Sequence, residues 1–195
     1  NPGDIATPVR GVVGRYDNIH VRLANATDID RGDQIVHFDD DSSVEYDFLV
    51  VACGAQTKRF GDKSWRRHST GLKTVEDALE LRHDILESFE RAEQSSDPDE
   101  IEAWLTFGIV GAGPTGVEMA GAIREIAAEV MVRDFDTIDP EETQVVLIDA
   151  ADDVLPGYPD ELCDYAEQAL EERGVEVVTG APVEEITDHS ISADG

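Results

Sequence analysis

The spacing of apolar positions in the first part of the chain predicts a small β region. Residues 19–23 alternate apolar and polar side chains, as in a strand with one buried face. Residues 35–38 form a second expected strand, followed by a polar turn at 39–43. The continuous apolar run Phe48-Leu-Val-Val51 is typical of a strand buried on both faces of a parallel sheet.

Beyond a loop-like stretch at 55–73, the pattern predicts a long helix. Thr74 and Asp77 have the spacing of a capping box at its start, and the breaker cluster 95–98 ends it. Several apolar residues keep close to one face of this helix: Val75, Ala78, Leu79, Leu86 and Phe89.

The second half predicts strands that alternate with helices. Buried strands are expected at 105–110 and 145–148, and a further strand at 175–178. Helices are expected at 115–129 and, beginning near Pro159, before Gly174. The second helix has an apolar stripe that we expect to face the core: Leu162, Tyr165, Ala166, Ala169 and Leu170. The predicted fold class is α/β, with a parallel sheet, helices and a small β-meander.

The strongest chemical signal is Gly111-Ala-Gly-Pro-Thr-Gly116, between an expected strand and an expected helix. In such a turn, Gly111 permits the tight bend, Gly113 admits a pyrophosphate, and Gly116 allows close helix packing. The helix N-terminus then attracts the phosphates. Pro114 and Thr115 are counted with the glycines as cofactor-binding residues, and the alternative is a glycine-rich turn without a ligand.

Two acidic residues accompany this motif. Asp149 ends the next strand, where a carboxylate can accept hydrogen bonds from an adenosine ribose and disfavour NADP; Ala150 follows it. The number of residues between the glycine motif and Asp149 exceeds the usual spacing because residues 133–143 intervene. A polar residue that merely ends a strand is the alternative for Asp149. Glu118 could act near a nicotinamide or simply be an acid near a helix N-terminus.

Charge excludes some partners. The chain has 44 acidic and 15 basic residues, a net charge of −29, and a pI of about 4.2. Such a surface repels nucleic acids and anionic lipid. Acids scattered through every segment, with three lysines, indicate a halophilic protein; an acidic surface selected for solubility is the alternative.

Other site types find little support in the sequence. Cys53 and Cys163 form no C-x-x-C pair, and the five histidines show no metal-binding spacing, so no metal site is expected. We expect a reduced cytoplasmic protein with no secretory signal and no membrane span.

Several motifs in order resemble the type II NADH:quinone oxidoreductases, within the FAD-dependent pyridine nucleotide-disulfide oxidoreductase superfamily. The resemblance covers about residues 44–187. It is carried by YDFLVVACGA at 46–55, LKTVEDAL at 72–79, LTFGIVGAGPTGVEMA at 105–120, and VLID at 146–149 with VLPG at 154–157.

The resemblance implies a partial Rossmann-like FAD/NAD(P)-binding fold. Residues 1–70 would be part of an FAD-binding domain, with Ala52, Cys53 and Gly54 near FAD. Residues 71–195 would be an NADH-binding domain, incomplete at its C-terminus. Hydride would pass from NADH to FAD, and electrons to a quinone, with Glu118 near the nicotinamide.

The sequence departs from the family in ways that affect these expectations. Cys53 replaces the usual threonine, and the first FAD glycine motif, the later FAD segment and the membrane-binding helices have no counterpart. We therefore expect an inactive fragment of a parent enzyme that is peripheral on the inner face of the membrane. Exposed sheet edges could pair two copies in a homodimer. A ferredoxin or rubredoxin reductase and a non-catalytic NADH-binding module are the alternative functions.

Overall fold

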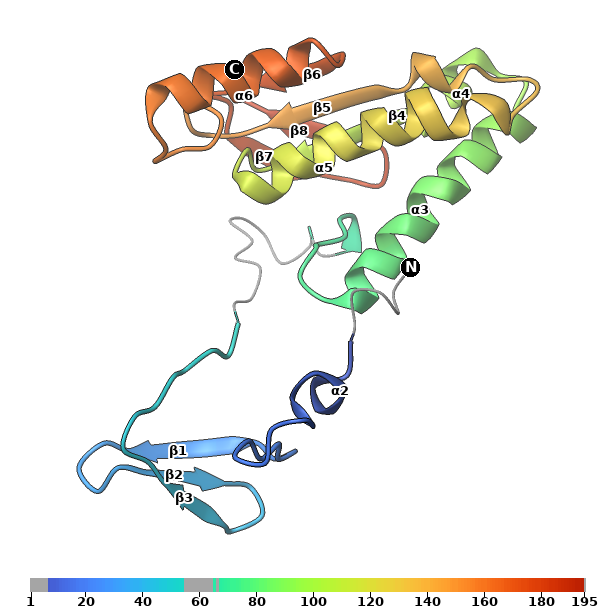
Figure 1. Cartoon of the computed structure of the whole chain (residues 1–195). Helices are drawn as coiled ribbons and strands as arrows, with labels where there is room; N and C mark the ends of the chain where they lie inside the picture. The colour runs from blue at the N-terminus through green and yellow to red at the C-terminus, as the bar shows by residue number, and fades with distance from the viewer. Residues whose placement is uncertain (1–6, 55–64, 66, 195) are drawn as a thin grey trace. The chain divides into compact units, whose positions relative to one another are not determined.

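The computed structural model describes residues 7–54, 65 and 67–194, excluding the side chain of Val130. The chain forms two compact units, Asn1–Gln56 and Thr57–Gly195, which are described separately (Figure 1). The predicted 55–73 loop lies partly outside the described residues.

The first unit is built around an antiparallel meander. After the short helix α2 (Val9–Val13), the strands β1 (Ala26–Asp30), β2 (Ile35–Phe38) and β3 (Ser43–Glu45) pair in chain order. The meander, the strand at 35–38 and the turn after it were predicted correctly. The strand expected at 19–23 is wrong, because these residues are irregular and Leu23 is 98% exposed.

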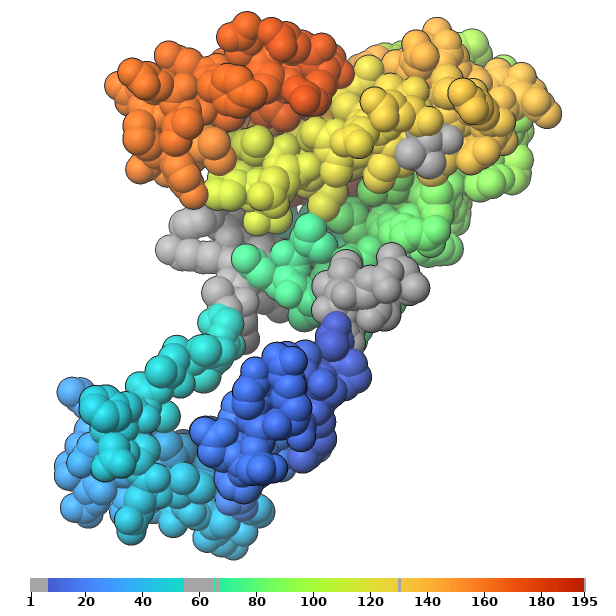
Figure 2. Space-filling model, in the orientation of Figure 1, coloured from blue at the N-terminus to red at the C-terminus, as the bar shows by residue number. Residues whose placement is uncertain are grey.

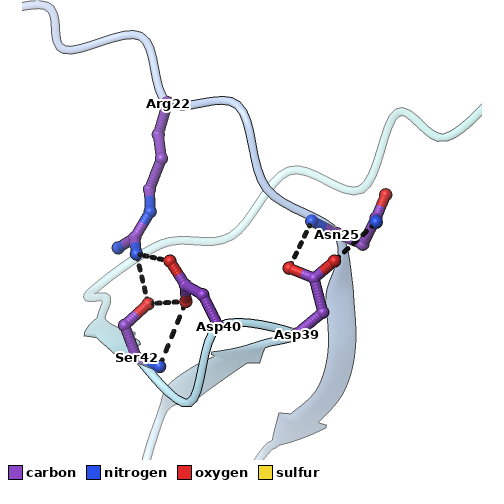
Figure 3. Close-up of polar contacts among 5 residues, drawn as sticks. All are labelled: Arg22, Asn25, Asp39, Asp40 and Ser42. Atoms are coloured by element: carbon purple, nitrogen blue, oxygen red, sulfur yellow. Dashed lines mark hydrogen bonds and ion pairs between the residues drawn. The ribbon is translucent and has the colours of Figure 1, made fainter.

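Polar contacts hold the segment before β1 in place (Figure 3). Arg22 forms an ion pair with Asp40 at 2.7 Å and donates a hydrogen bond to the hydroxyl of Ser42. The hydrogen bond from Ser42, followed by that from Arg22, lowers the pKa of Asp40 to about 2. Asn25 donates from its backbone and side chain to the carboxylate of Asp39. These contacts fix the segment through side chains, so it does not need a strand partner.

The strand predicted at 48–51 is also wrong. These residues are irregular, and Phe48 is 94% exposed. A buried parallel strand needs hydrogen-bonded neighbours and covered faces, and the described residues supply none beside this run.

The second unit is organised by a parallel sheet with the order β4-β5-β6. The strands β4 (Thr106–Val110), β5 (Gln144–Ile148) and β6 (Val175–Val178) lie where the sequence predicted them. Helices α5 (Pro114–Glu125) and α6 (Asp160–Glu171) connect them, which confirms the α/β prediction. α5 continues through a π-helical turn, Ile126–Val130, as expected for a helix reaching residue 129.

The two faces of the sheet have different covers. Phe107, Val145, Leu147 and Val175 belong to one apolar core with residues of α5, α6 and α3. Helices α5 and α6 contact each other and form a continuous surface over this layer (Figures 1 and 2). The opposite face carries the hairpin of β7 (Val183–Ile186) and β8 (Ile191–Ala193), which the sequence did not predict.

Only one face of β4 is well covered, contrary to the prediction of a fully buried strand. Thr106, Gly108 and Val110 alternate with the core-facing residues and remain exposed, although a Cβ on Gly108 would meet the side chain of Ile191. β4 pairs with β5 alone within the described sheet. An edge strand covered by a small hairpin leaves part of one face open.

Helix α3 (Val75–Gln94) precedes the sheet and begins at the predicted capping box. Thr74 accepts from the N–H of Asp77, whose carboxylate accepts from the N–H of Thr74. Phe89 is fully buried, with its ring 6.0 Å from that of Phe107. Leu79 is exposed, and the buried residues of α3 are Ile85, Phe89 and Ala92, nearer its C-terminus than predicted. A short unpredicted helix, α4 (Pro98–Trp104), follows it.

The stripe predicted on α6 is only partly core. Cys163 and Leu170 are buried, whereas Leu162 is exposed and Tyr165 is 71% exposed. The buried side of α6 is the one that contacts the sheet and α5, and the spacing of apolar residues did not predict which side this is.

A single carboxylate anchors the insertion between α5 and β5. Glu93 of α3 accepts hydrogen bonds from the N–H groups of Asp136, Thr137 and Ile138 at 3.0–3.2 Å. Burial by itself raises the pKa of Glu93, but hydrogen bonds from Thr137 and the neighbouring N–H groups outweigh it and lower the pKa below 4.5.

We expect Glu93→Gln to lower the melting temperature, because the amide replaces one acceptor oxygen with a donor. Since the folded pKa is depressed, the stabilisation by Glu93 is present above pH 4.5 and lost as pH falls through the folded pKa. The difference from wild type should therefore shrink in acid. Thermal melts followed by circular dichroism at several pH values measure this. Glu90→Gln, at an exposed glutamate of the same helix, is the control. A difference independent of pH would contradict the assignment.

The surface is acidic, and among the described residues few basic side chains lie close to carboxylates. Arginine–carboxylate ion pairs join Arg22 to Asp40 and Arg91 to Glu87, and His68 and His83 contact Asp188 and Glu87. No helix in this part of the chain is long and apolar enough to cross a membrane.

We expect the melting temperature to rise with NaCl, because salt screens the repulsion between carboxylates. The Debye length falls from about 8 Å at about 0.15 M to about 3 Å at about 1 M. Sucrose, which strengthens burial without screening charge, is the control in the same thermal melts. A flat or falling melting temperature in NaCl would rule out repulsion as a main limit on stability.

Candidate functional site

The glycine motif forms a tight turn between β4 and α5. Gly111 has a φ of +108°, in the region that favours glycine, and its N–H donates to the carbonyl of Ile148 at 2.8 Å. The turn is therefore tied to the end of β5. A side chain at Gly111 would strain this backbone.

The other two glycines differ in what surrounds them. A Cβ on Gly116 would lie 1.8 Å from the carbonyl oxygen of Gly111 and 3.4 Å from the side chain of Leu147. The fold itself therefore requires a glycine at 116. A Cβ on Gly113 would meet no atom within 4 Å. The space above Gly113 is open, as an approaching ligand requires.

The first turn of α5 is free of negative charge. Gly113 is its N-cap, Pro114 follows, and no side chain caps the helix. The α-helices α3, α4 and α6 each have two acids in the first turn: Glu76 and Asp77 in α3, Asp99 and Glu100 in α4, and Asp160 and Glu161 in α6. In so acidic a chain, the N–H groups and positive dipole end of α5 are left available to an anion.

Asp149 lies beside this turn, as predicted. It follows β5, and its carboxylate accepts hydrogen bonds from the N–H groups of Ala112, at 2.5 Å, and Ala151, at 2.7 Å. Ala150 is exposed next to it. A carboxylate has about four acceptor positions, so Asp149 keeps capacity for ligand hydroxyls.

Glu118 lies on the same helix as the glycine turn. It is exposed on α5, two residues after Gly116. Pro114, Thr115, Gly116 and Glu118 thus lie on α5, and Gly111 and Gly113 lie in the turn that leads into it.

Ala52, Cys53 and Gly54 belong to the other compact unit. They are exposed and irregular, and Gly54 has a φ of +70°. Cys53 and Cys163 are both free thiols. Burial raises the pKa of the Cys163 thiol, and the carboxylates of Asp153 and Asp160 add to this effect, so this sulfur is poorly suited to act as a thiolate.

Sequence reasoning missed the backbone contacts that complete the turn. The N–H of Leu155 donates to the carbonyl of Ala112 at 2.7 Å, and Ala151 donates to Asp149. The VLPG stretch at 154–157 was noted only as a family motif, and nothing in it pointed to this contact.

Two clefts lie elsewhere on the second unit. One, of about 410 Å³, is lined by Arg67, Asp84, Asp188 and His68, whose Nδ1 lies 2.6 Å from the Asp188 carboxylate. The other, of about 650 Å³, adjoins α4 and the 137–144 segment. Across the described residues, no group of three or more His, Cys, Asp or Glu side chains could hold a metal ion.

Comparison with known proteins gives this turn a family context. The profile of the pyridine nucleotide-disulphide oxidoreductase family matches residues 2–194. The type II NADH:quinone oxidoreductase Ndh of Mycobacterium tuberculosis is 42% identical over 193 residues, which cover 97% of this chain and 42% of that protein. NdhA of the same organism, also a type II NADH:quinone oxidoreductase, is 45% identical over 184 residues, covering 93% and 39%. The predicted family resemblance is thus confirmed.

The structural comparison agrees in fold. NDH2 from Plasmodium falciparum, solved in complex with NADH, has a TM-score of 0.70 at 22% identity, covering 86% of this chain and 35% of that one. This chain spans about two fifths of the length of the M. tuberculosis relatives. It belongs to the pyridine nucleotide-disulphide oxidoreductase family.

Proposed function

We propose that this chain is the NADH-binding part of an FAD-dependent NADH dehydrogenase of type II. The complete protein would pass electrons from NADH through FAD to a quinone; the names of the M. tuberculosis relatives say of those proteins that they are NADH:quinone oxidoreductases. The observation that carries the proposal is the open space at Gly113, at the start of α5, whose first turn has no acids, unlike those of α3, α4 and α6. No neighbouring atom requires a glycine at this position, which supports the approach of a ligand there.

Different residues would bind different parts of the nucleotide. The N–H groups of Gly113, Thr115 and Gly116, together with the dipole of α5, would hold the pyrophosphate. Gly111, whose own N–H donates to Ile148, and Pro114, which has no N–H, would shape the turn around it. Asp149 and Ala150 would meet the adenosine ribose at the end of β5. Glu118, farther along α5, would lie on the nicotinamide side.

The flavin would involve the other unit. We propose that residues 1–70 are part of an FAD-binding domain, with Ala52, Cys53 and Gly54 near FAD, and that 71–195 bind NADH. The exposed backbone at 52–54 and the positive φ of Gly54 are compatible with a close approach by a ligand. Bound FAD would supply the hydride acceptor, while the chain's own residues bind and orient the nucleotide.

Activity belongs to a longer protein in this proposal. Because the chain spans about two fifths of its relatives, the expected behaviour of this span alone is NADH binding without quinone reduction. We place the complete protein in the cytoplasm, peripheral on the inner face of the membrane. Pairing through the edge of β4, which has one partner in the described sheet, would support a homodimer.

We expect calorimetric titration of the chain in high salt to show tighter binding of NADH than of NADPH. The carboxylate of Asp149 would repel the extra phosphate of NADPH, and one such contact corresponds to roughly tenfold in affinity. Equal affinities would argue against the assignment of Asp149 to the ribose. No binding of either nucleotide by the folded chain would count against an NADH site in this span.

Gly113→Ala and Gly116→Ala should separate binding from folding. At Gly113 the added methyl group occupies the open ligand space, so NADH affinity should fall about tenfold or more with little change in melting temperature. At Gly116 it collides with the Gly111 carbonyl, so stability should fall by about 1–3 kcal/mol or more. Thermal melts and calorimetry on both variants test this. A Gly113→Ala variant that binds NADH normally would contradict the proposed pyrophosphate position.

A further inference from the structure

The carboxylate of Asp149 links two loops at the same end of the sheet. Its Oδ2 accepts from the N–H of Ala112 at 2.5 Å, although the two residues are 37 positions apart. Its Oδ1 accepts from the N–H of Ala151 at 2.7 Å. Both bonds are partly buried, so they are protected from competition with water.

The residue that Asp149 contacts is the second residue of the glycine turn. Ala112 is fully buried, and its carbonyl accepts from the N–H of Leu155 at 2.7 Å. Gly111, just before it, donates to the carbonyl of Ile148. Three hydrogen bonds thus fix the backbone directly before Gly113. Among these three, only the bond accepted by the Asp149 carboxylate involves a side chain.

We propose that Asp149 is a positioning residue for the pyrophosphate cradle, in addition to its role toward the ribose. Its carboxylate holds Ala112, and Ala112 determines where the N–H groups of Gly113 and the first turn of α5 point. The inference rests on the proposed NADH site and deepens it. It means that Asp149 contributes to the binding of a phosphate ligand that has no ribose.

The direction in which phosphate affinity changes on loss of Asp149 distinguishes a displaced turn from a lost charge. Asp149 carries a negative charge close to the proposed phosphate position, in a chain with a net charge of −29. Removing a negative charge should by itself strengthen the binding of an anion. A weaker binding of phosphate after loss of Asp149 therefore reports a displaced turn and not a lost charge.

The test uses the whole chain with inorganic pyrophosphate and NADH as probes, measured by calorimetry. Asp149→Ala should lower affinity for pyrophosphate about tenfold or more, the loss expected for a charge-assisted hydrogen bond. Asp149→Asn, which retains one acceptor oxygen, should lie between wild type and Asp149→Ala. Asp152→Ala is the matched control, because Asp152 is an exposed acid in the same segment. It should leave pyrophosphate affinity unchanged or slightly raised.

A second measurement needs no ligand. Amide hydrogen exchange of the free chain should show Ala112 protected in wild type and Asp152→Ala, and exposed in Asp149→Ala, with global melting temperatures as the folding check. Unchanged protection of Ala112 would overturn the positioning role. So would an Asp149→Ala variant that loses NADH but keeps pyrophosphate. If wild type binds neither probe, the NADH proposal fails, and the exchange result still decides whether Asp149 positions the turn.

Discussion

The close approach of helix α5 to the turn after β4 is the constraint on which the second unit depends. With hydrogen at position 116, the helix starts against the carbonyl of Gly111, and no side chain would fit between them. This contact directs α5 across the sheet, where Ala120 and Ile123 complete the core against Val145 and Leu147. The same contact brings the helix N-terminus to the end of β5. The packing of α5 and the geometry of the proposed anion site therefore depend on the same contact.

Charge is distributed so that this position stands out. The chain has 44 acidic residues, and α3, α4 and α6 begin with acids that complement their helix dipoles. α5 has Gly113 as its N-cap and begins with Pro114 and Thr115, so no acid in its first turn stabilises its dipole. Asp149 does place a negative charge near the start of α5, but its carboxylate accepts hydrogen bonds from the backbone N–H groups of Ala112 and Ala151. In a chain whose surface repels anions, the start of α5 therefore differs from the starts of α3, α4 and α6, and this difference supports the proposed anion site.

Sequence patterns located the elements that are determined locally. The capping box at Thr74, the strands of the parallel sheet and the start of α5 at the glycine motif all lie where expected. The failures share a physical reason. Residues 19–23 and 48–51 have the apolar content of strands, but a strand also needs a partner. On α6, spacing predicted a core stripe, while the sheet and α5 decided that Cys163 is buried and Tyr165 is not.

By itself, the sequence determined the fold class, the glycine motif with Asp149 and Glu118 as candidate ligand residues, and the acidic surface. These follow from residue type and from spacing along one strand or helix. The tertiary structure decided the rest: that Gly116 is required by packing while Gly113 faces open space, and that Asp149 and Leu155 both bond to Ala112. The bonds to Ala112 join residues tens of positions apart. Their geometry exists only once the strands have paired and the helix has docked, so no local pattern could specify it.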